Sequence, residues 1–340
     1  GGSFWVRPLA IEVLLGVGLA LLYWWEVEPP QGLTPTRVAV WGGGAVGIPL
    51  QDPVATHAQF LLHAVLIALM AVATFIDVDE KMIPEEITDI GAIAGLLLVV
   101  LLPMARLPEW NALVGGAPAW DQSMYLNFTS PNAWQPWLNG ARGLGIGLGC
   151  FCAWWLAIVP WEYIRRRRSV LTGLRMALAN FVVCLSGRRP RLKYYRMLLV
   201  IGLVGFGGTL VVWALQSAIG QQRWVALLSS LVGMAAGGAI VWAVRIIGSR
   251  ALGQEAMGFG DVTLVAMIGA FLGWQPCLML FFIAPFIGVV IALVQLLLTG
   301  RKDIWYGPFL CAGALATIVF WATLWEGYGR ILFGMGWLVP

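Results

Sequence analysis

The feature that most constrains this chain is a series of apolar segments, each about as long as a bilayer is thick. A helix needs about 20 mostly apolar residues to cross the hydrocarbon core. Segments that approach this length, with boundaries uncertain by a few residues, are 8–25, 56–76, 87–105, 141–163, 196–216, 224–246, 261–275, 277–299 and 308–326. The seventh is short and ends at Pro276. We therefore predict an all-α polytopic membrane protein with about nine transmembrane helices, forming one membrane-embedded domain over residues 1–340.

The composition excludes a soluble globular protein. The chain is 60% hydrophobic and only 11% charged, and its mean hydropathy is +0.82. A soluble domain is about half apolar and about a quarter charged. The 19 tryptophans are typical of the aromatic belts at membrane interfaces. We expect the lipid bilayer to be a partner of this chain, and no nucleic acid.

The distribution of basic residues predicts the orientation. Loops on the cytoplasmic side carry an excess of Lys and Arg. If the segments above all cross the membrane, one side holds most of the 21 Lys and Arg. The other side holds only Arg37, Arg106, Arg142, Arg223 and Arg330. This asymmetry places the amino terminus in the cytoplasm.

Two long loops stand out from the apolar pattern. Loop 164–195, on the inner side, contains basic clusters at 165–168 and 188–193. Between them, 170–185 is predicted to be an amphipathic helix on the cytoplasmic face of the membrane; a docking surface for a partner is the alternative. The Trp-rich loop 106–140, on the outer side, is predicted to be an ordered or interfacial cap.

An acidic residue, Asp261, stands at the start of the seventh apolar segment. An ionisable group at a membrane border is expensive to place, so it is a functional-site hypothesis by default. Gly258 and Gly260 precede it, and glycines let the backbone turn tightly and let another backbone come close. The structural alternative is a glycine hinge followed by an Asp that caps the next helix.

A second carboxylate, Asp77, closes the segment 56–76 at the same predicted membrane face. Two carboxylates that lie close together share one proton near neutral pH, which suits acid–base hydrolysis of a peptide bond. Asp79 is the rival, since it lies two residues further on and nearer to water. Pro84 then restarts the chain toward the next helix.

No metal site is predicted. The five cysteines form no CxxC pair, so no zinc framework is visible. His57 and His63 have no ligand partner nearby in the sequence.

Four ordered segments resemble bacterial type IV prepilin peptidases. Asp77–Thr88 is similar to the D-x-D-x-x-x-x-P-D-x-L-T stretch of that family, with Glu85 in place of the Asp after the Pro. Glu255–Leu264 is similar to its E-G-M-G-x-G-D segment. Arg7–Gly16 resembles R-Y-P-L-x-E-L-L-T-G, and Tyr306–Leu310 resembles F-G-P-F-L.

This resemblance implies a GxGD-type intramembrane aspartic protease with Asp77 and Asp261 as the catalytic pair. The implied substrate is a prepilin or pseudopilin, whose short basic leader is cut after a Gly at the cytoplasmic face of the bacterial inner membrane. Proteolysis needs no cofactor. Members of the family often also methylate the new amino terminus with S-adenosylmethionine, so that cofactor is implied if methylation is retained. Glu255 belongs to the matched motif and is a candidate supporting residue.

The chain departs from the family pattern in two larger respects. Bifunctional members carry paired CxxC motifs before the R-Y-P-L segment, and this sequence begins at that point. Methylation, and a zinc-binding segment before Gly1, are therefore left open. Residues 141–222 are predicted to be an insertion with two extra helices and the basic loop.

Glu12, in the first apolar segment, has two interpretations. It is a polar contact that supports the active site or methyl transfer, or it is a buried, hydrogen-bonded carboxylate that ties helices together; we favour the second.

Two alternative functions remain for the whole chain. The first is a secondary transporter or channel that uses Asp77 and Asp261 as a proton or cation relay. The second is a catalytically inactive assembly factor of a secretion machinery.

Overall fold

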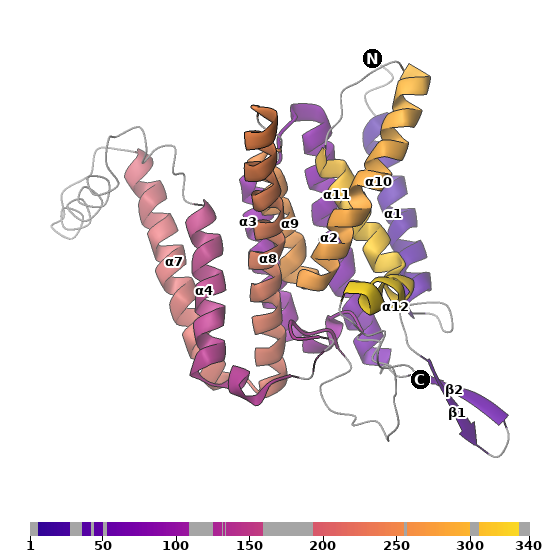
Figure 1. The fold of residues 1–340 in the computed structure, drawn as a ribbon, viewed down its shortest axis with the longest axis vertical. Helices are drawn as coiled ribbons and strands as arrows, with labels where there is room; N and C mark the ends of the chain where they lie inside the picture. Colours follow the sequence, from indigo (N-terminus) through magenta and orange to yellow (C-terminus); the bar gives the residue numbers. More distant parts are fainter. Residues whose placement is uncertain are drawn as a thin grey trace.

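The computed structural model describes residues 6–27, 36–41, 44–49, 53–108, 125–130, 132, 134–158, 193–254, 257–299 and 306–332. The helices are α1 (Val6–Val27), α2 (Pro53–Glu80), α3 (Glu85–Leu101), α4 (Ala141–Ile158), α7 (Lys193–Ala218), α8 (Gln221–Leu252), α9 (Phe259–Leu272), α10 (Trp274–Thr299), α11 (Tyr306–Val319) and α12 (Trp321–Leu332). They form an elongated bundle (Figure 1).

The predicted all-α membrane class is confirmed. Every predicted span coincides with an apolar helix, and five of these helices are long and apolar enough to cross a membrane by themselves. The ninth span differs, because the chain breaks after Val319 into α11 and the shorter α12. The seventh ends earlier than predicted, at Leu272, because Gly273 has a φ of 98° and Trp274 already begins α10.

A small hairpin adds to the helices between α1 and α2. Strands β1 (Thr36–Trp41) and β2 (Gly44–Pro49) pair antiparallel, with Thr36 opposite Pro49 and Trp41 opposite Gly44. The hairpin extends from the lower end of the bundle in Figure 1. The predicted amphipathic helix 170–185 lies outside the described residues.

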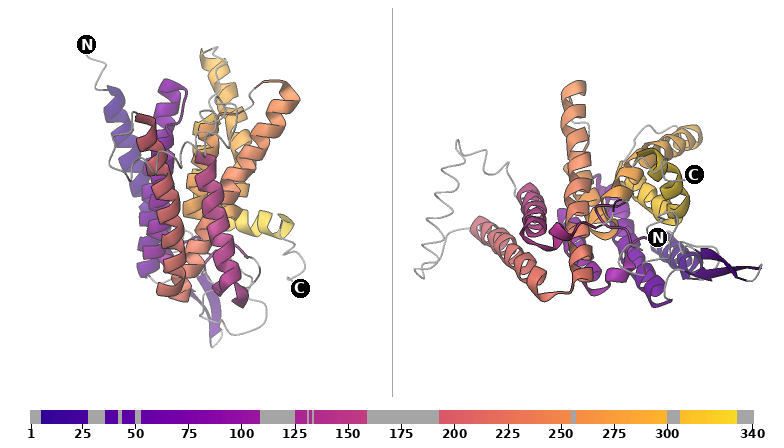
Figure 2. Two further views of the ribbon diagram at one scale, coloured as in Figure 1. Left: turned by 90° about the vertical axis from the view of Figure 1, so that its left-hand side faces the viewer. Right: turned by 60° about the horizontal axis from the view of Figure 1, so that its bottom comes forward.

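Helix α9 is the core of the molecule. Every residue from Asp261 to Leu272 is buried, and the helix is apolar all round, as a fully enclosed helix is expected to be. It packs on α8, α3, α10 and α11. The two views of Figure 2 show that α4 and α7 lie to one side of this core.

Small residues allow the close packing around α9. A Cβ at Gly233 of α8 would collide with the backbone oxygen of Gly269, and one at Gly237 would lie 2.7 Å from the oxygen of Val265. On the other flank, a Cβ at Gly95 of α3 would lie 2.7 Å from the ring of Phe271. Small residues three or four apart let membrane helices approach closely. Helix α9 therefore packs closely against the glycines of α8 on one side and of α3 on the other.

The loop between α3 and α4 is fastened to the bundle by tryptophan side chains. It contains the 3-10 turns η1 (Pro103–Ala105) and η2 (Pro136–Asn139). The indole N–H of Trp224 donates to Leu138 at 2.9 Å, and that of Trp274 donates to Phe128 at 2.8 Å. The described parts of the predicted Trp-rich cap are therefore ordered, although residues 109–124 lie outside the described ranges.

Candidate functional site

Asp77 lies near the end of α2, on the face that the helix turns toward the bundle. This face also carries Leu66, Met70 and Ala73, all buried, at alternating spacings of three and four. Asp77 is the polar member of the stripe and is only 7% exposed. The helix ends just beyond it at Glu80. Lys81 follows with a φ of 58°, which breaks the helical path, while its N–H still donates to the Asp77 carbonyl at 2.9 Å.

The chain returns to the bundle immediately after this break. Pro84 has φ −64° and ψ 127°, and α3 begins at the next residue. Proline is pre-organised for this position because its fixed φ suits the entry to a helix. The backbone thus leaves the α2–α3 link at Pro84 and enters the next helix, as predicted from the sequence.

Asp261 lies in the first turn of α9. Gly258 is the residue before the helix and has extended backbone. Its N–H donates to the carboxylate of Asp261, and Thr263 donates from its hydroxyl to the carbonyl of Gly260 at 3.0 Å. The Asp261 side chain is 8% exposed. A carboxylate here also benefits from the positive end of the helix dipole.

The two aspartates come together in space. The charge of Asp77 acts on Asp261, so the two carboxylates lie within range of electrostatic interaction at one end of the bundle. Ile83, from the α2–α3 link, lies close to the start of α9. A Cβ at Gly260 would be 2.9 Å from the Ile83 Cβ. Gly260 therefore makes room for this chain's own backbone beside the start of α9.

Helix α11 supplies the group that holds Asp77. The N–H of Gly307, in the first turn of α11, donates to the Asp77 carboxylate. A Cβ at Gly307 would lie 2.5 Å from Oδ2 of Asp77 and 3.0 Å from Cδ1 of Ile83. The neighbouring Tyr306 interacts electrostatically with Asp261. The sequence singled out Tyr306–Leu310 as a motif, but it gave no sign that this segment holds Asp77 and lies within electrostatic range of Asp261.

Arg245 of α8 holds the segment before Asp261, and sequence reasoning missed it. Its Nε donates to the carbonyl of Met257 at 3.0 Å. Its guanidinium carbon lies 5.7 Å from the centre of the Phe259 ring, which is within the range of a cation–π contact. In the sequence, Arg245 is simply one of the 21 Lys and Arg residues.

The remaining predicted residues lie away from the pair. Asp79 is exposed on the last turn of α2, so the structure buries Asp77 and leaves its rival toward solvent. Glu255 lies outside the described residues. Glu12 is exposed on α1, which corrects the interpretation of it as a buried tie between helices. It lies about 100° around the helix from Ile11, which is on the face that α1 turns toward α2.

Two buried carboxylates that interact in this way cannot both carry a full charge without a large electrostatic cost. The arrangement can therefore hold one proton between them. Each carboxylate accepts a backbone N–H at a helix start, which fixes its position. Within the described ranges, no three His, Cys, Asp or Glu side chains gather as metal ligands.

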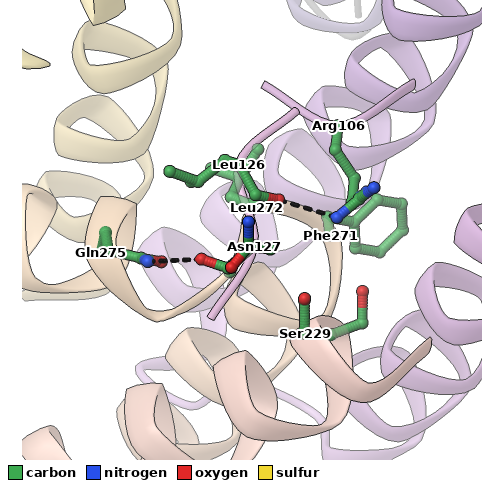
Figure 3. A pocket seen from close by; sticks show the side chains of 9 residues that line it. Arg106, Leu126, Asn127, Ser229, Phe271, Leu272 and Gln275 are labelled. Carbon is green, nitrogen blue, oxygen red and sulfur yellow. Dashed lines mark hydrogen bonds between the residues drawn. The ribbon is translucent and has the colours of Figure 1, made fainter. Parts of the chain in front are cut away.

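A polar pocket lies at the other end of α9, about 18 Å from Asp261 at 1.5 Å per residue. Figure 3 shows Arg106 donating to the carbonyl of Leu126 at 2.9 Å and Gln275 donating to that of Asn127 at 2.7 Å. Ser229 also lines it. The cavity itself measures about 10 Å³, which is room for about one water molecule and far less than a typical ligand pocket offers. This pocket does not fit S-adenosylmethionine.

The comparisons with known proteins cover the part of the chain that carries one of the two aspartates. Residues 192–293 match the model of the type IV leader peptidase family. That segment contains Asp261, whereas Asp77 lies outside it. The resemblance predicted from the sequence is thereby confirmed. No solved structure matches the chain.

Three curated relatives carry the name prepilin leader peptidase/N-methyltransferase. The protein of Burkholderia pseudomallei (strain 1026b) is 33% identical over 101 residues, 28% of this chain and 32% of the relative. That of Pectobacterium carotovorum subsp. carotovorum is 35% identical over 95 residues, 27% of this chain and 34% of the relative. That of Escherichia coli (strain K12) is 27% identical over 169 residues, 47% of this chain and 73% of the relative. The matched segment thus spans about a third of the length of the first two relatives.

Proposed function

From this family relationship over residues 192–293, we propose that the chain is a membrane aspartic endopeptidase. Asp77 and Asp261 are its catalytic pair, and its substrate is a type IV prepilin or pseudopilin. The observation that carries the proposal is the meeting of two buried carboxylates from segments far apart in sequence. Each of them accepts a backbone N–H, from Gly307 and from Gly258.

The chemistry follows from the shared proton. The ionised carboxylate takes a proton from a water molecule, whose oxygen attacks the scissile carbonyl carbon. The protonated carboxylate donates a hydrogen bond to the carbonyl oxygen, and the amine leaves after it has received a proton. The titration belongs to the pair and not to either residue alone.

The surroundings of the pair suit a substrate with a basic leader. Asp79, Glu80, Glu85 and Glu86 are exposed at the same end of the bundle. Attraction between these carboxylates and the basic residues of the leader would raise the rate at which substrate and enzyme meet, and it would orient the bound substrate. The hydrophobic helix of the substrate would lie in the lipid beside the bundle, and Gly258, which is exposed, leaves its backbone room to approach.

Membrane placement and the extra segments belong to the same proposal. The basic loops and the exposed acidic end are assigned to the cytoplasmic face of a bacterial inner membrane. Residues 141–222, which include α4 and α7, are assigned as an insertion. Methylation of the new amino terminus is what the names of the relatives suggest. Because the described pocket does not fit S-adenosylmethionine, we derive no methyl-transfer step.

The relay alternative is less well supported. One route for protons to Asp77 is the buried face of α2, on which the next titratable side chain is His63, about 21 Å away at 1.5 Å per residue. The face of α2 between them carries Leu66, Met70 and Ala73, which are at most 3% exposed. A dry apolar segment of this length carries no chain of hydrogen bonds for protons.

The test is cleavage of a prepilin by the full chain in membranes. Asp77→Asn and Asp261→Asn should each abolish cleavage, because an amide cannot take or give the proton. Asp79→Asn is the matched control and should keep cutting, since that carboxylate is exposed. If both catalytic variants still cut, the proposal is wrong. Proton uptake into proteoliposomes that falls with either variant would favour the relay instead.

A further inference from the structure

Tyr306, the first residue of α11, brings a hydroxyl group to the side of the aspartate pair. It precedes Gly307, whose N–H donates to Asp77, and it interacts electrostatically with Asp261. Cys311, about one turn further along α11, interacts electrostatically with both aspartates. The first turns of α11 therefore flank the pair, and Tyr306 belongs to the site that the two carboxylates form.

The direction of Tyr306 on α11 differs from that of its neighbour. Consecutive residues of a helix point about 100° apart, so Tyr306 does not share the side on which Gly307 meets α2. It lies on the same side of α11 as Phe309 and Gly313, which are three and seven residues further on. Both of these pack on α10. Gly307 thus serves the carboxylate on α2, while Tyr306 lies on the side where the chain leads back to α9.

The hydroxyl of Tyr306 is available for a bound molecule. It makes no hydrogen bond within the part of the chain that the structure describes, although it lies within electrostatic range of Asp261. The side chain is half-buried, so the group is not sealed off from a ligand. The N–H groups of Gly258 and Gly307 are already used on the two carboxylates. Tyr306 therefore adds a donor that the pair leaves unused.

Hydrolysis at the pair needs such a donor. The carbonyl oxygen of the scissile bond gains negative charge when water attacks, and hydrogen bonds aimed at this oxygen stabilise the transition state. A phenol has a usual pKa of about 10 and so carries its proton at neutral pH. We propose that the Tyr306 hydroxyl donates a hydrogen bond to the scissile carbonyl oxygen, beside the one from the protonated aspartate. This catalytic role rests on the proposed function and adds a second donor to it.

Replacing Tyr306 by phenylalanine tests this role, because the change removes the hydroxyl and keeps the ring. The motif that Tyr306–Leu310 resembles has Phe at this position, so the fold should accept it. In membranes, Tyr306→Phe should cut a prepilin with a kcat about 100-fold lower and an unchanged KM, since the donor acts mainly in the transition state. A variant with the kcat of the parent overturns the proposal.

Tyr23→Phe is the matched control. It removes the same atom from α1, where the hydroxyl contacts His57 at 3.2 Å. His57 lies about 30 Å along α2 from Asp77 at 1.5 Å per residue, so this variant should cut at the rate of the parent. The proposed function fails separately. A parent chain that cuts no prepilin refutes it, whereas a cutting parent with an equally fast Tyr306→Phe variant refutes only the role of Tyr306.

Two inhibitors separate a contact with the substrate from an effect on the shape or charge of the site. Both carry a prepilin cleavage sequence. In one, a ketone hydrate replaces the scissile amide and keeps an oxygen at the carbonyl position; in the other, a –CH2–CH2– unit has no oxygen there. Tyr306→Phe should weaken inhibition by the first about 10-fold, the worth of one hydrogen bond, and leave the second unchanged. Equal weakening of both overturns the proposal.

Discussion

At the residue scale, the absence of side chains at Gly307 and Gly260 sets the geometry of the site. Gly307 carries the N–H that holds Asp77, and Gly260 lets Ile83 pass beside the start of α9. The two glycines lie on different helices and contact the same link between α2 and α3. A single methyl group at either position would move one carboxylate relative to the other.

Gly307→Ala should lower prepilin cleavage by about 100-fold, because the added Cβ would lie 2.5 Å from Oδ2 of Asp77 and a displacement of about 1 Å can cost that much. The measurement is the initial cleavage rate in membranes at equal protein level. Gly145→Ala is the control, since nothing lies within 4 Å of its Cβ. Full activity in Gly307→Ala would show that this N–H does not position Asp77.

Arg245→Met should reduce the cleavage rate while leaving the chain folded. The change removes the hydrogen bond to Met257 and the contact with Phe259, so the segment before Asp261 loses a support on one side. A loss of about 10-fold in rate, with an unfolding midpoint within a few degrees of the parent, is expected for a positioning residue. Arg250→Met, at an exposed arginine further along α8, should change neither quantity; an equal loss in both variants would contradict the assignment.

At the scale of elements, α9 depends on the glycines of its neighbours. An apolar helix is not drawn to other apolar helices inside a bilayer by the hydrophobic effect, so close van der Waals packing must hold it. The contact of Gly233 with Gly269 brings two backbones together. The same packing fixes the height of Asp261 relative to Asp77.

Gly233→Ala should destabilise the bundle by about 1–3 kcal/mol, the usual cost of overpacking, because the new Cβ would collide with the backbone of Gly269. The midpoint of thermal unfolding in detergent measures the effect. Gly207→Ala on α7 has nothing within 4 Å of its Cβ and should be neutral or slightly stabilising. A Gly233→Ala chain as stable as the parent would mean that α8 and α9 are not in backbone contact.

At the scale of the whole molecule, the bundle has two chemically different ends. One carries the aspartate pair and exposed carboxylates. The other carries the hairpin and the loop fastened by tryptophan indoles. From the positive-inside rule we propose that the first end faces the cytoplasm, which is where a peptidase that cuts a basic leader would work.

Single cysteines placed at the two ends test this orientation. Met82→Cys, at a side chain 60% exposed beside the Asp77 end, should react with a membrane-impermeant maleimide only when inverted vesicles expose the cytoplasmic face. Trp137→Cys, at a side chain 45% exposed on the opposite end, should react from the outside of spheroplasts. Both are made in a chain whose own cysteines are replaced by serine. Labelling of both from one side would refute the topology.

The length and apolarity of the segments determined the helices by themselves, because a bilayer accepts little else than helices of that length. The sequence also marked Asp77 and Asp261, since an ionisable group at a membrane border stands out from its apolar neighbours. Helix ends were less well predicted. The break after Val319 has no proline or glycine at Phe320 to signal it. Beyond the break, Trp321 and Trp325 are fully buried and their rings stack with centroids 5.1 Å apart, which is a tertiary contact.

Only the tertiary structure decided which distant groups meet. Nothing local to Gly307 says that its N–H faces Asp77, and nothing near Arg245 says that it holds Met257. Glu12 and Glu26 lie on the same helix, and the sequence favoured the first as the buried tie. The structure buries the second, because only the outer end of α1 meets polar groups of α2. Such contacts depend on the relative rotation and height of whole helices, which packing sets and which no single segment encodes.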